Sequence, residues 1–405
     1  MSKLAIHGGE PLRKQPFPNR EPFGEEEERL VVAALGTQSL YMGSFVEKFE
    51  REFAGFYGAK HAVSSTSGSA ALHVAIGAID PDPGDEIITA PITDVGTITA
   101  IMLQTAIPVF ADIDPATFNM DPADVERKIT NRTRAIVVVH LFGNAADIAA
   151  MADVAKRHGV TLIEDCSQSH AIKLNGRYIG TYGDIGCFSL QQSKFMTTGD
   201  GGMTITENDG YAERMRLFMN KAVVSTEVGH REYDFLAPTY RMNELTAAVG
   251  LAQIPKLRGV VLRRQKLGEL LTSLISDIPG LEPVAVTPGS EHGYWTYPLR
   301  TPGFDALEFA RALIAEGVAS TQAYIGRPIY LCSQALREKN YFGDSHFPFT
   351  SEFTDHEFNY AEGACPVTEE MMGRMVGVSL NEAYSEDDIR DMAAAIAKVA
   401  EGLRE

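Results

Sequence analysis

One lysine of the chain has neighbours that would favour a reactive amine. In FSLQQSKFMTTGDGGM (188–203), Lys194 follows a short apolar run and precedes Gly199, Gly201 and Gly202. Most lysines are solvated surface residues, but a lysine buried between apolar segments titrates low and can act as an amine nucleophile. The glycines permit the tight turn that would present such an amine.

Two further segments carry residue types that bind charged ligands. Ser67-Gly68-Ser69 precedes the helical stretch AALHVAIGAI, and a helix start rich in small residues leaves free N–H groups that suit a phosphate. Taken alone, this pattern is typical of an ordinary N-cap. Asp165 ends the apolar run VTLIED (160–165), where a carboxylate either lies at the ligand edge of a parallel sheet or anchors a loop.

Together these parts meet the needs of one cofactor, pyridoxal 5'-phosphate. Its phosphate binds at a helix N-terminus, its pyridine nitrogen stays protonated beside a carboxylate, and its aldehyde forms a Schiff base with a lysine. The three parts occur in chain order as Ser67-Gly68-Ser69, Asp165 and Lys194. The four cysteines are scattered without a CxxC pair, so we predict neither a metal site nor a disulfide framework.

The same segments resemble the DegT/DnrJ-type sugar aminotransferases, a branch of the fold-type I enzymes that use pyridoxal phosphate. The similarity runs from LAIHGG in the first residues to CPVTEEM (365–371), and SGSAALHVAI, IEDCSQSH and FSLQQSKFMTTGDGGM are its most specific parts. The resemblance implies an α/β fold: a large domain with a mostly parallel mixed sheet between helices, and a smaller C-terminal α+β domain.

The resemblance also implies roles for individual residues. Asp165 would pair with the pyridine nitrogen, Gln168 would lie near the ring hydroxyl, and Lys194 would form the Schiff base and move protons. The phosphate would be held by Ser67, Gly68, Ser69 and Ser189.

Two positions depart from the family pattern. Where relatives often stack an aromatic residue on the pyridine ring, TAPITDVGT has Asp94. Where a partner-chain asparagine reaches the phosphate in the family, LAPTYRMNEL (236–245) has Thr239, whose hydroxyl has a shorter reach. Both residues are nevertheless expected to contact the cofactor. This second segment also implies a homodimer with shared active sites.

The resemblance implies a transaminase that takes its amino group from glutamate or glutamine. The predicted acceptor is the ketone of a nucleotide-linked sugar, and the alternative is a cyclitol ketone, because LAIHGGEPLR resembles the cyclitol branch. A sugar dehydratase, whose lysine is replaced by histidine, is less favoured because Lys194 is present. A non-catalytic regulator is less favoured because nothing in the chain resembles a DNA-binding domain and the net charge of -18 disfavours DNA. Four residues could serve the acceptor by their vicinity alone: Trp295, Tyr324, Arg327 and Tyr330.

Alternating strands and helices must position these residues. Short apolar β-branched runs predict strands at 86–89, 106–113, 135–142, 160–165, 187–190 and 202–206. Apolar residues at helical spacing predict helices at 45–57, 121–130, 144–159, 257–278, 305–317 and 385–403, the last capped by Ser385. This alternation favours a largely parallel sheet, which binds ligands beyond the carboxyl ends of its strands.

Charge and length set the remaining expectations. A net charge of -18 over 405 residues, without a basic cluster, argues against binding to nucleic acid or to anionic membrane surfaces. We see no targeting signal and no run of about 20 apolar residues, which predicts a cytoplasmic protein. The expected units are an N-terminal arm (1–25), a large cofactor-binding domain (26–255) and a small domain (256–405).

Overall fold

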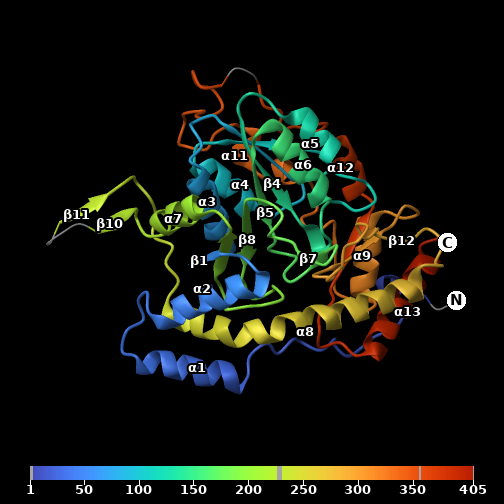
Figure 1. Ribbon diagram of the computed structural model, residues 1–405. Coiled ribbons are helices and arrows are strands. Elements are labelled where there is room, and N and C mark those ends of the chain that lie inside the picture. The colour runs from blue at the N-terminus through green and yellow to red at the C-terminus, as the bar shows by residue number, and fades with distance from the viewer. Residues whose placement is uncertain (1–2, 226–229, 355–356, 405) are drawn as a thin grey trace.

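A seven-stranded sheet forms the centre of the molecule (Figure 1). The computed structural model describes residues 3–225, 230–354 and 357–404. All neighbouring strands of this sheet are parallel except β9, which runs antiparallel to both β1 and β8. In spatial order the strands are β1 (His61–Ser65), β9 (Gly202–Thr206), β8 (Ile185–Ser189), β5 (Thr161–Asp165), β4 (Thr133–Val139), β2 (Glu86–Thr89) and β3 (Ile107–Phe110). The mostly parallel mixed sheet predicted from the sequence is therefore confirmed.

Both faces of this sheet are covered by helices. Ile136 and Val138 of β4 pack with one set of helices: α2 (Ser44–Tyr57), α5 (Pro122–Lys128), α6 (Ile148–His158) and α8 (Glu244–Ile275). Ala135 and Val137 pack with the other set: α3 (Gly68–Ile79), α4 (Val95–Leu103) and α7 (Asp209–Phe218). Because successive strand residues point to opposite faces, burial on both faces explains why β4 reads as a continuous apolar run.

β4 is shorter than its apolar run predicts. The strand ends at Val139, and the chain then forms the short 3-10 helix η2 (Leu141–Gly143). His140 is still extended and its amide donates to the Asp165 carbonyl, whereas Phe142, with a φ of 58°, takes the backbone out of the strand path. The expected strand residues Leu141 and Phe142 are buried in the turn instead.

A second, antiparallel sheet lies beside the first. Its strands are β12 (Glu282–Pro283), β13 (Tyr297–Arg300), β15 (Met375–Val378) and β14 (Ser320–Gln322), in that spatial order. Leu299 and Val376 of this sheet share a core with α9 (Ala306–Ala315), α13 (Glu386–Gly402) and the last turns of α8. Ser385 caps α13, as predicted, by accepting a hydrogen bond from the Asp388 amide.

Helix α8 joins the two sheets. Its first half contributes Ala247 and Leu251 to the core of the large sheet, and its second half contributes Leu267 and Leu271 to the core of the small one. The sequence predicted this helix only from residue 257, and the structure shows that it begins earlier, at Glu244. Asn243 caps the helix, and it passes through Pro255 without ending. The expected domain boundary falls inside α8 and stays a prediction.

The length and composition of α8 resemble those of a membrane span, although half of its most apolar stretch is buried within the protein. The helix packs against α2, α13 and α1 (Glu25–Gly36), and many of its apolar residues are buried in the two cores, although Leu262 and Leu274 are exposed.

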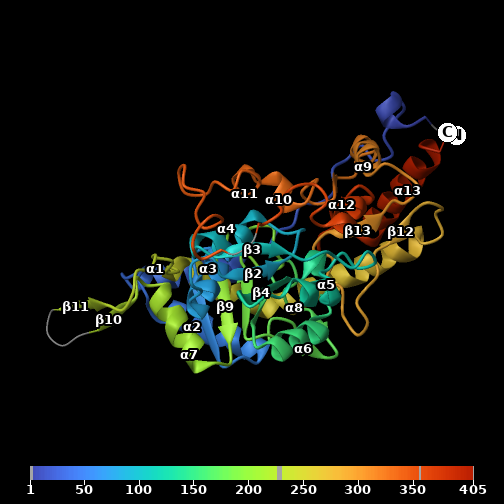
Figure 2. The ribbon, with the colours of Figure 1, turned by 90° about the horizontal axis from the view of Figure 1, so that it is seen from above.

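Several short elements complete the chain. Two of them, α10 (Ile329–Cys332) and α11 (Gln334–Arg337), lie near α4 (Figure 2), where Ile329 and Tyr330 pack with Phe110 of β3. The hairpin of β10 (Val223–Ser225) and β11 (Arg231–Tyr233) extends away from the body of the molecule in both views. The others are η1 (Ala5–His7), β6 (Lys173–Leu174), β7 (Arg177–Tyr178) and α12 (Pro366–Met372). Residues 8–24 contain neither helix nor strand.

Candidate active site

A cavity of about 420 Å³ opens where several strands of the large sheet end. Val139, Asp165 and Ser189 are the last residues of β4, β5 and β8, and all three line the cavity. This is the edge at which a parallel sheet binds ligands. The cavity brings together these residues predicted from the sequence: Ser67, Gly68, Ser69, Asp94, Asp165, Gln168, Ser189 and Lys194.

Thr239 is the predicted site residue that does not line this cavity. It is exposed and forms an isolated bridge with Asn220, near the hairpin. Its expected contact came from the partner chain of a dimer, so within one chain Thr239 is not part of the site.

The first turn of α3 forms one wall of the cavity. Ser67 is its N-cap, with extended backbone, and its Oγ accepts a hydrogen bond of 3.1 Å from the Ala70 amide. A Cβ atom on Gly68 would lie 2.5 Å from the Cβ atom of Ser189, so only glycine lets the helix start approach the end of β8 this closely. The helix therefore presents amide N–H groups and hydroxyls at its positive end, a fit for a phosphate.

Asp165 supplies a buried carboxylate. It is 5% exposed, and its Oδ1 accepts a hydrogen bond of 3.0 Å from the Ser167 amide. Thr97 Oγ1, in the first turn of α4, donates to Asp165 Oδ2 over 3.2 Å and is itself bonded to Thr93. These two threonines were missed from the sequence, although the run TDVGT places hydroxyls where α4 begins. These hydrogen bonds fix the carboxyl group and leave it acceptor capacity for a ring nitrogen.

Gln168 is oriented by the backbone of the neighbouring turn. Its Oε1 accepts a hydrogen bond of 3.0 Å from the Phe142 amide, which leaves the side-chain NH₂ group to act as a donor. A donor beside the cavity fits the predicted contact to a ring hydroxyl.

Lys194 is buried, with 9% of its surface exposed. Burial lowers the pKa of its amine, while the negative charges of Asp165 and Asp94 act in the opposite direction and do not outweigh it. The Nζ atom lies 4.4 Å from the ring centroid of Trp295, as in a cation–π pair. The amine therefore has a larger neutral, nucleophilic fraction than a surface lysine has.

Two aromatic residues also line the cavity. The rings of Trp295 and Tyr324 meet edge to face with centroids 5.6 Å apart, and both residues line the cavity. Burial raises the pKa of Tyr324, and the charges of Asp94 and Asp165 raise it further, so its hydroxyl stays protonated. The other two residues suggested for the acceptor do not line the cavity: Tyr330 is buried and Arg327 is exposed.

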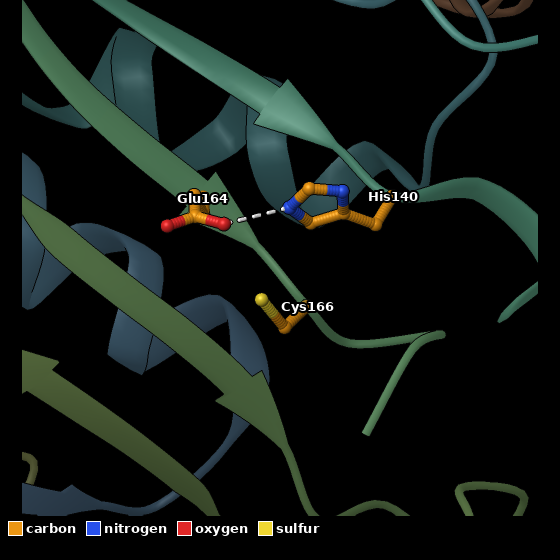
Figure 3. Close-up of side chains that lie close together, drawn as sticks. All are labelled: His140, Glu164 and Cys166. Carbon is orange, nitrogen blue, oxygen red and sulfur yellow. Dashed lines mark hydrogen bonds and ion pairs between the residues drawn. The ribbon is translucent and has the colours of Figure 1, made fainter. Parts of the chain in front are cut away.

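A second buried polar cluster includes the two sequence neighbours of Asp165. His140, Glu164 and Cys166 lie close together (Figure 3), with potential metal ligands within 4.8 Å of one another. However, the ligand atoms of the first two are already used. Glu164 accepts hydrogen bonds from the amides of Gly180 and Gly183 and from His140 Nε2, and His140 Nδ1 accepts one from the Ala146 amide.

This bonding pattern is that of a structural hydrogen-bond network and not that of a metal centre. With Nδ1 as an acceptor, the proton of His140 lies on Nε2 and points to Glu164, so neither nitrogen has a lone pair to offer. Burial raises the pKa of the Cys166 thiol well above its usual value, with Glu164 and Asp165 adding to the effect, so it stays neutral. The cluster ties the ends of β4 and β5 to the turn at 180–183.

The carboxylate of Asp94 gives a direct test of the electrostatics around Lys194. Asp94→Asn removes one of the two negative charges that favour the ammonium form, so the pKa of Lys194 should fall further below its usual value. Asparagine is also a good N-cap, so α4 should keep its start. The measurement is the pH dependence of Lys194 labelling by an amine reagent in the cofactor-free protein, read by peptide mass spectrometry. Asp200→Asn is the matched control: Asp200 lines the cavity but is not among the charges that shift Lys194. A pKa that stays constant or rises in Asp94→Asn would contradict the assignment.

Comparison with known proteins agrees with this geometry. A family model described as the DegT/DnrJ/EryC1/StrS aminotransferase family matches residues 22–397. The chain is 34% identical to the L-glutamine:2-deoxy-scyllo-inosose aminotransferase of Streptomyces kanamyceticus, over 98% of this chain and 97% of that protein. It is 35% identical to the GDP-perosamine synthase of Vibrio cholerae, over 62% of this chain and 68% of that protein.

A solved structure supports the same conclusion. The aminotransferase TlmJ from Streptoalloteichus hindustanus is similar with a TM-score of 0.81 and 27% identity, covering 96% of this chain and 100% of that chain. The family resemblance, the type I fold and the cofactor expected from the sequence are therefore confirmed. The chain belongs to the DegT/DnrJ/EryC1/StrS aminotransferase family, the members of which are transaminases that depend on pyridoxal phosphate.

Proposed function

We propose that this sugar or cyclitol aminotransferase moves an amino group from glutamine or glutamate to the ketone of a polyhydroxylated ring. The observation that carries the proposal is the meeting, in one cavity, of a buried lysine, a buried carboxylate and the N-terminus of α3. Bound pyridoxal phosphate supplies a carbonyl that reacts with amines and a ring that withdraws electrons.

Different residues of the cavity would bind different parts of pyridoxal phosphate. The first turn of α3, with Ser189 beside it, would bind the phosphate through hydroxyls and amides. Asp165, which is held by Thr97 and the Ser167 amide, would pair with the pyridine nitrogen. Gln168 would donate to the ring hydroxyl. Asp94, at the start of α4, lines the same space and acts on the charge of Lys194.

Lys194 Nζ is the group that moves protons. With its pKa lowered by burial, the neutral amine removes the Cα proton of the amino-acid donor and later returns a proton. The ring of Trp295, 4.4 Å away, holds the amine on one side of the cavity. Because donor and acceptor use one site in turn, the kinetics should be of the ping-pong type.

The charge of the cavity bears on the choice of acceptor. Its lining contains three carboxylates, those of Asp94, Asp165 and Asp200, and Lys194 as its cationic side chain. A nucleotide-linked sugar brings a diphosphate, which needs several cations or amide donors. An uncharged cyclitol ketone needs neither, and the relative matched over 98% of this chain is named for a scyllo-inosose substrate. We therefore favour the cyclitol ketone.

The nucleotide-linked ketone predicted first from the sequence is the second candidate. The similarity to a GDP-perosamine synthase over 62% of this chain favours it. In that case the cations that bind the diphosphate would come from a partner chain.

We further propose a homodimer in which the segment around Thr239 reaches the partner's phosphate site. Large apolar side chains are exposed near the start of the chain and near this segment, among them Val32, Tyr41 and Leu236, the last with 98% of its surface exposed. Such surfaces are typical of contacts between chains. A cytoplasmic location also stays a proposal.

The role of Lys194 is tested by substitution. In Lys194→Ala, transamination should fall by roughly 10³-fold or more, because the lysine amine that lines the cavity and is positioned to move the proton is lost. The parent protein should also show a visible absorption band that bleaches when glutamine or glutamate is added, and the variant should not. Lys156→Ala, an exposed lysine on α6, is the control and should match the parent. Transamination at the parent rate by Lys194→Ala would refute the assignment.

The acceptor is tested by competition between ketones. With glutamine as donor, a scyllo-inosose-type ketone should have a kcat/KM at least about a hundredfold above that of a nucleotide-linked keto hexose. If the negative charge of the cavity causes this preference, an Asp94→Asn, Asp200→Asn double variant should show a smaller ratio between the two kcat/KM values. A preference for the nucleotide-linked ketone would support the second candidate. A product that has lost a hydroxyl without gaining an amine would indicate a dehydratase.

The assembly is tested by sedimentation. The active protein should sediment as a species of twice the chain mass of 44.1 kDa, because the proposed site needs residues of both chains. Full activity in a fraction that contains only monomer would contradict the shared site.

A further inference from the structure

The turn that carries Lys194 is held by side chains from outside it. Arg20, in the N-terminal arm, donates through its two terminal nitrogens to the backbone carbonyls of Gln192 (3.3 Å), Lys194 and Phe195 (3.1 Å). The remaining carbonyl of this stretch, that of Ser193, accepts a hydrogen bond of 3.0 Å from Trp295 Nε1. Every carbonyl from residue 192 to 195 is therefore bound by a donor that is distant in sequence.

The guanidinium of Arg20 is held in turn by a carboxylate. Its Nε lies 2.9 Å from Glu382 Oε1, and the two side chains are only 14% and 18% exposed. The other oxygen of Glu382 pairs with Arg264 of α8 at 2.7 Å. Burial alone would raise the pKa of Glu382, but the charges of Arg264 and Arg20 outweigh it and lower the pKa. Glu382 thus stays ionised between the two arginines.

Arg264 extends this network to the wall of the cavity. It is 2% exposed, and its guanidinium lies 4.9 Å from the ring centroid of Phe195. It also donates a hydrogen bond of 3.4 Å to the carbonyl of Trp295, the residue whose ring faces Lys194 Nζ. The arm, α8 and the segment after β15 therefore each contribute one side chain to the network that contacts the turn carrying Lys194.

Arginine is the side chain that this arrangement requires. A guanidinium offers five N–H groups in one plane, so it can bind several carbonyls and a carboxylate at once, whereas a lysine ammonium has three donors on a flexible stem. Without such a donor the carbonyls of this turn would lose their partners, and Gly199 and Gly201, which follow it, restrict the backbone little. The path of the turn is thus set from outside.

We propose that Arg20 is a positioning residue: with Glu382 it fixes the turn at 191–195 and so sets the place of Lys194 Nζ relative to Trp295 and Asp165. The residue acts through the backbone and does not touch the reacting atoms. The N-terminal arm is then a working part of the active site. Only the kinetic consequence rests on the function proposed for Lys194.

The same arm offers a matched control. Arg13 pairs with Asp388 and Asp391 of α13, so Arg13→Gln loosens the arm without touching the turn. Arg20→Gln removes the three carbonyl contacts and the pair with Glu382. Arg20→Lys keeps the positive charge but loses the planar guanidinium, which can donate to several carbonyls at once.

The first measurement is amide hydrogen exchange in the cofactor-free, full-length protein. In Arg20→Gln the peptide covering 191–199, which contains the Lys194 and Thr198 amides bonded within this turn, should exchange roughly tenfold faster. Arg20→Lys should give an intermediate value. Arg13→Gln should leave this peptide unchanged and speed exchange only near the start of α13. Parent-like exchange of the peptide in both Arg20 variants would overturn the proposal. If Arg20→Gln does not fold, Arg20→Lys decides by the same criterion.

The second measurement is the steady-state kinetics of the loaded enzyme. A misplaced amine should lower kcat by roughly tenfold or more while the KM of the donor changes little, because binding groups elsewhere in the cavity are kept. Arg20→Lys should recover part of kcat. Faster exchange together with an unchanged kcat would overturn the positioning role. If Arg20→Gln exchanges faster but Lys194→Ala is fully active, the result would still support the fixing of the turn by Arg20 and would refute the proposed function.

Discussion

The position of one buried amine is the constraint on which the rest of this structure depends. Lys194 Nζ lies against the ring of Trp295, with Asp165 and Asp94 near enough to act on its charge. Burial and these carboxylates act in opposite directions on its protonation, and burial is the stronger effect. A nucleophile of this kind works only when it is held at a short, defined distance from its target. The turn, the arm and the aromatic wall all serve that purpose.

Parallel strands assemble the opposite wall because their register places strand ends side by side. Val139 pairs with Asp165, and Asp165 with Cys187, two residues before the end of β8. Asp165 and Ser189 thus reach one edge although they lie far apart in sequence. Next to Asp165, the fully bonded Glu164 fixes the end of β5 from the other side of the strand.

The parts that could be predicted from the sequence are those with local signals. The run GMTIT matches β9 residue for residue, and Asp165 was found because it ends a buried apolar strand. Thr97 and Arg20 could not be found in this way, because their partners lie 68 and 174 residues away and no spacing links them. Thr239 was assigned by family resemblance alone, and one chain does not bring it to the cavity. The start of α8 was also missed: the helix begins at Glu244 and passes through Pro255, a residue type that normally ends a helix.

Pro255 affects how easily α8 can bend. Pro255 lacks an N–H group, so the carbonyl of Leu251 has no donor four residues ahead, and one rung of the α8 ladder is missing. The gap lies within the part of the helix packed on the large sheet, because Leu257 and Val261 beyond it still belong to that core, whereas the part packed on the small sheet begins at Leu267. Because the missing hydrogen bond weakens this turn, any bending of α8 should cost least there, within the part of the helix that packs on the large sheet.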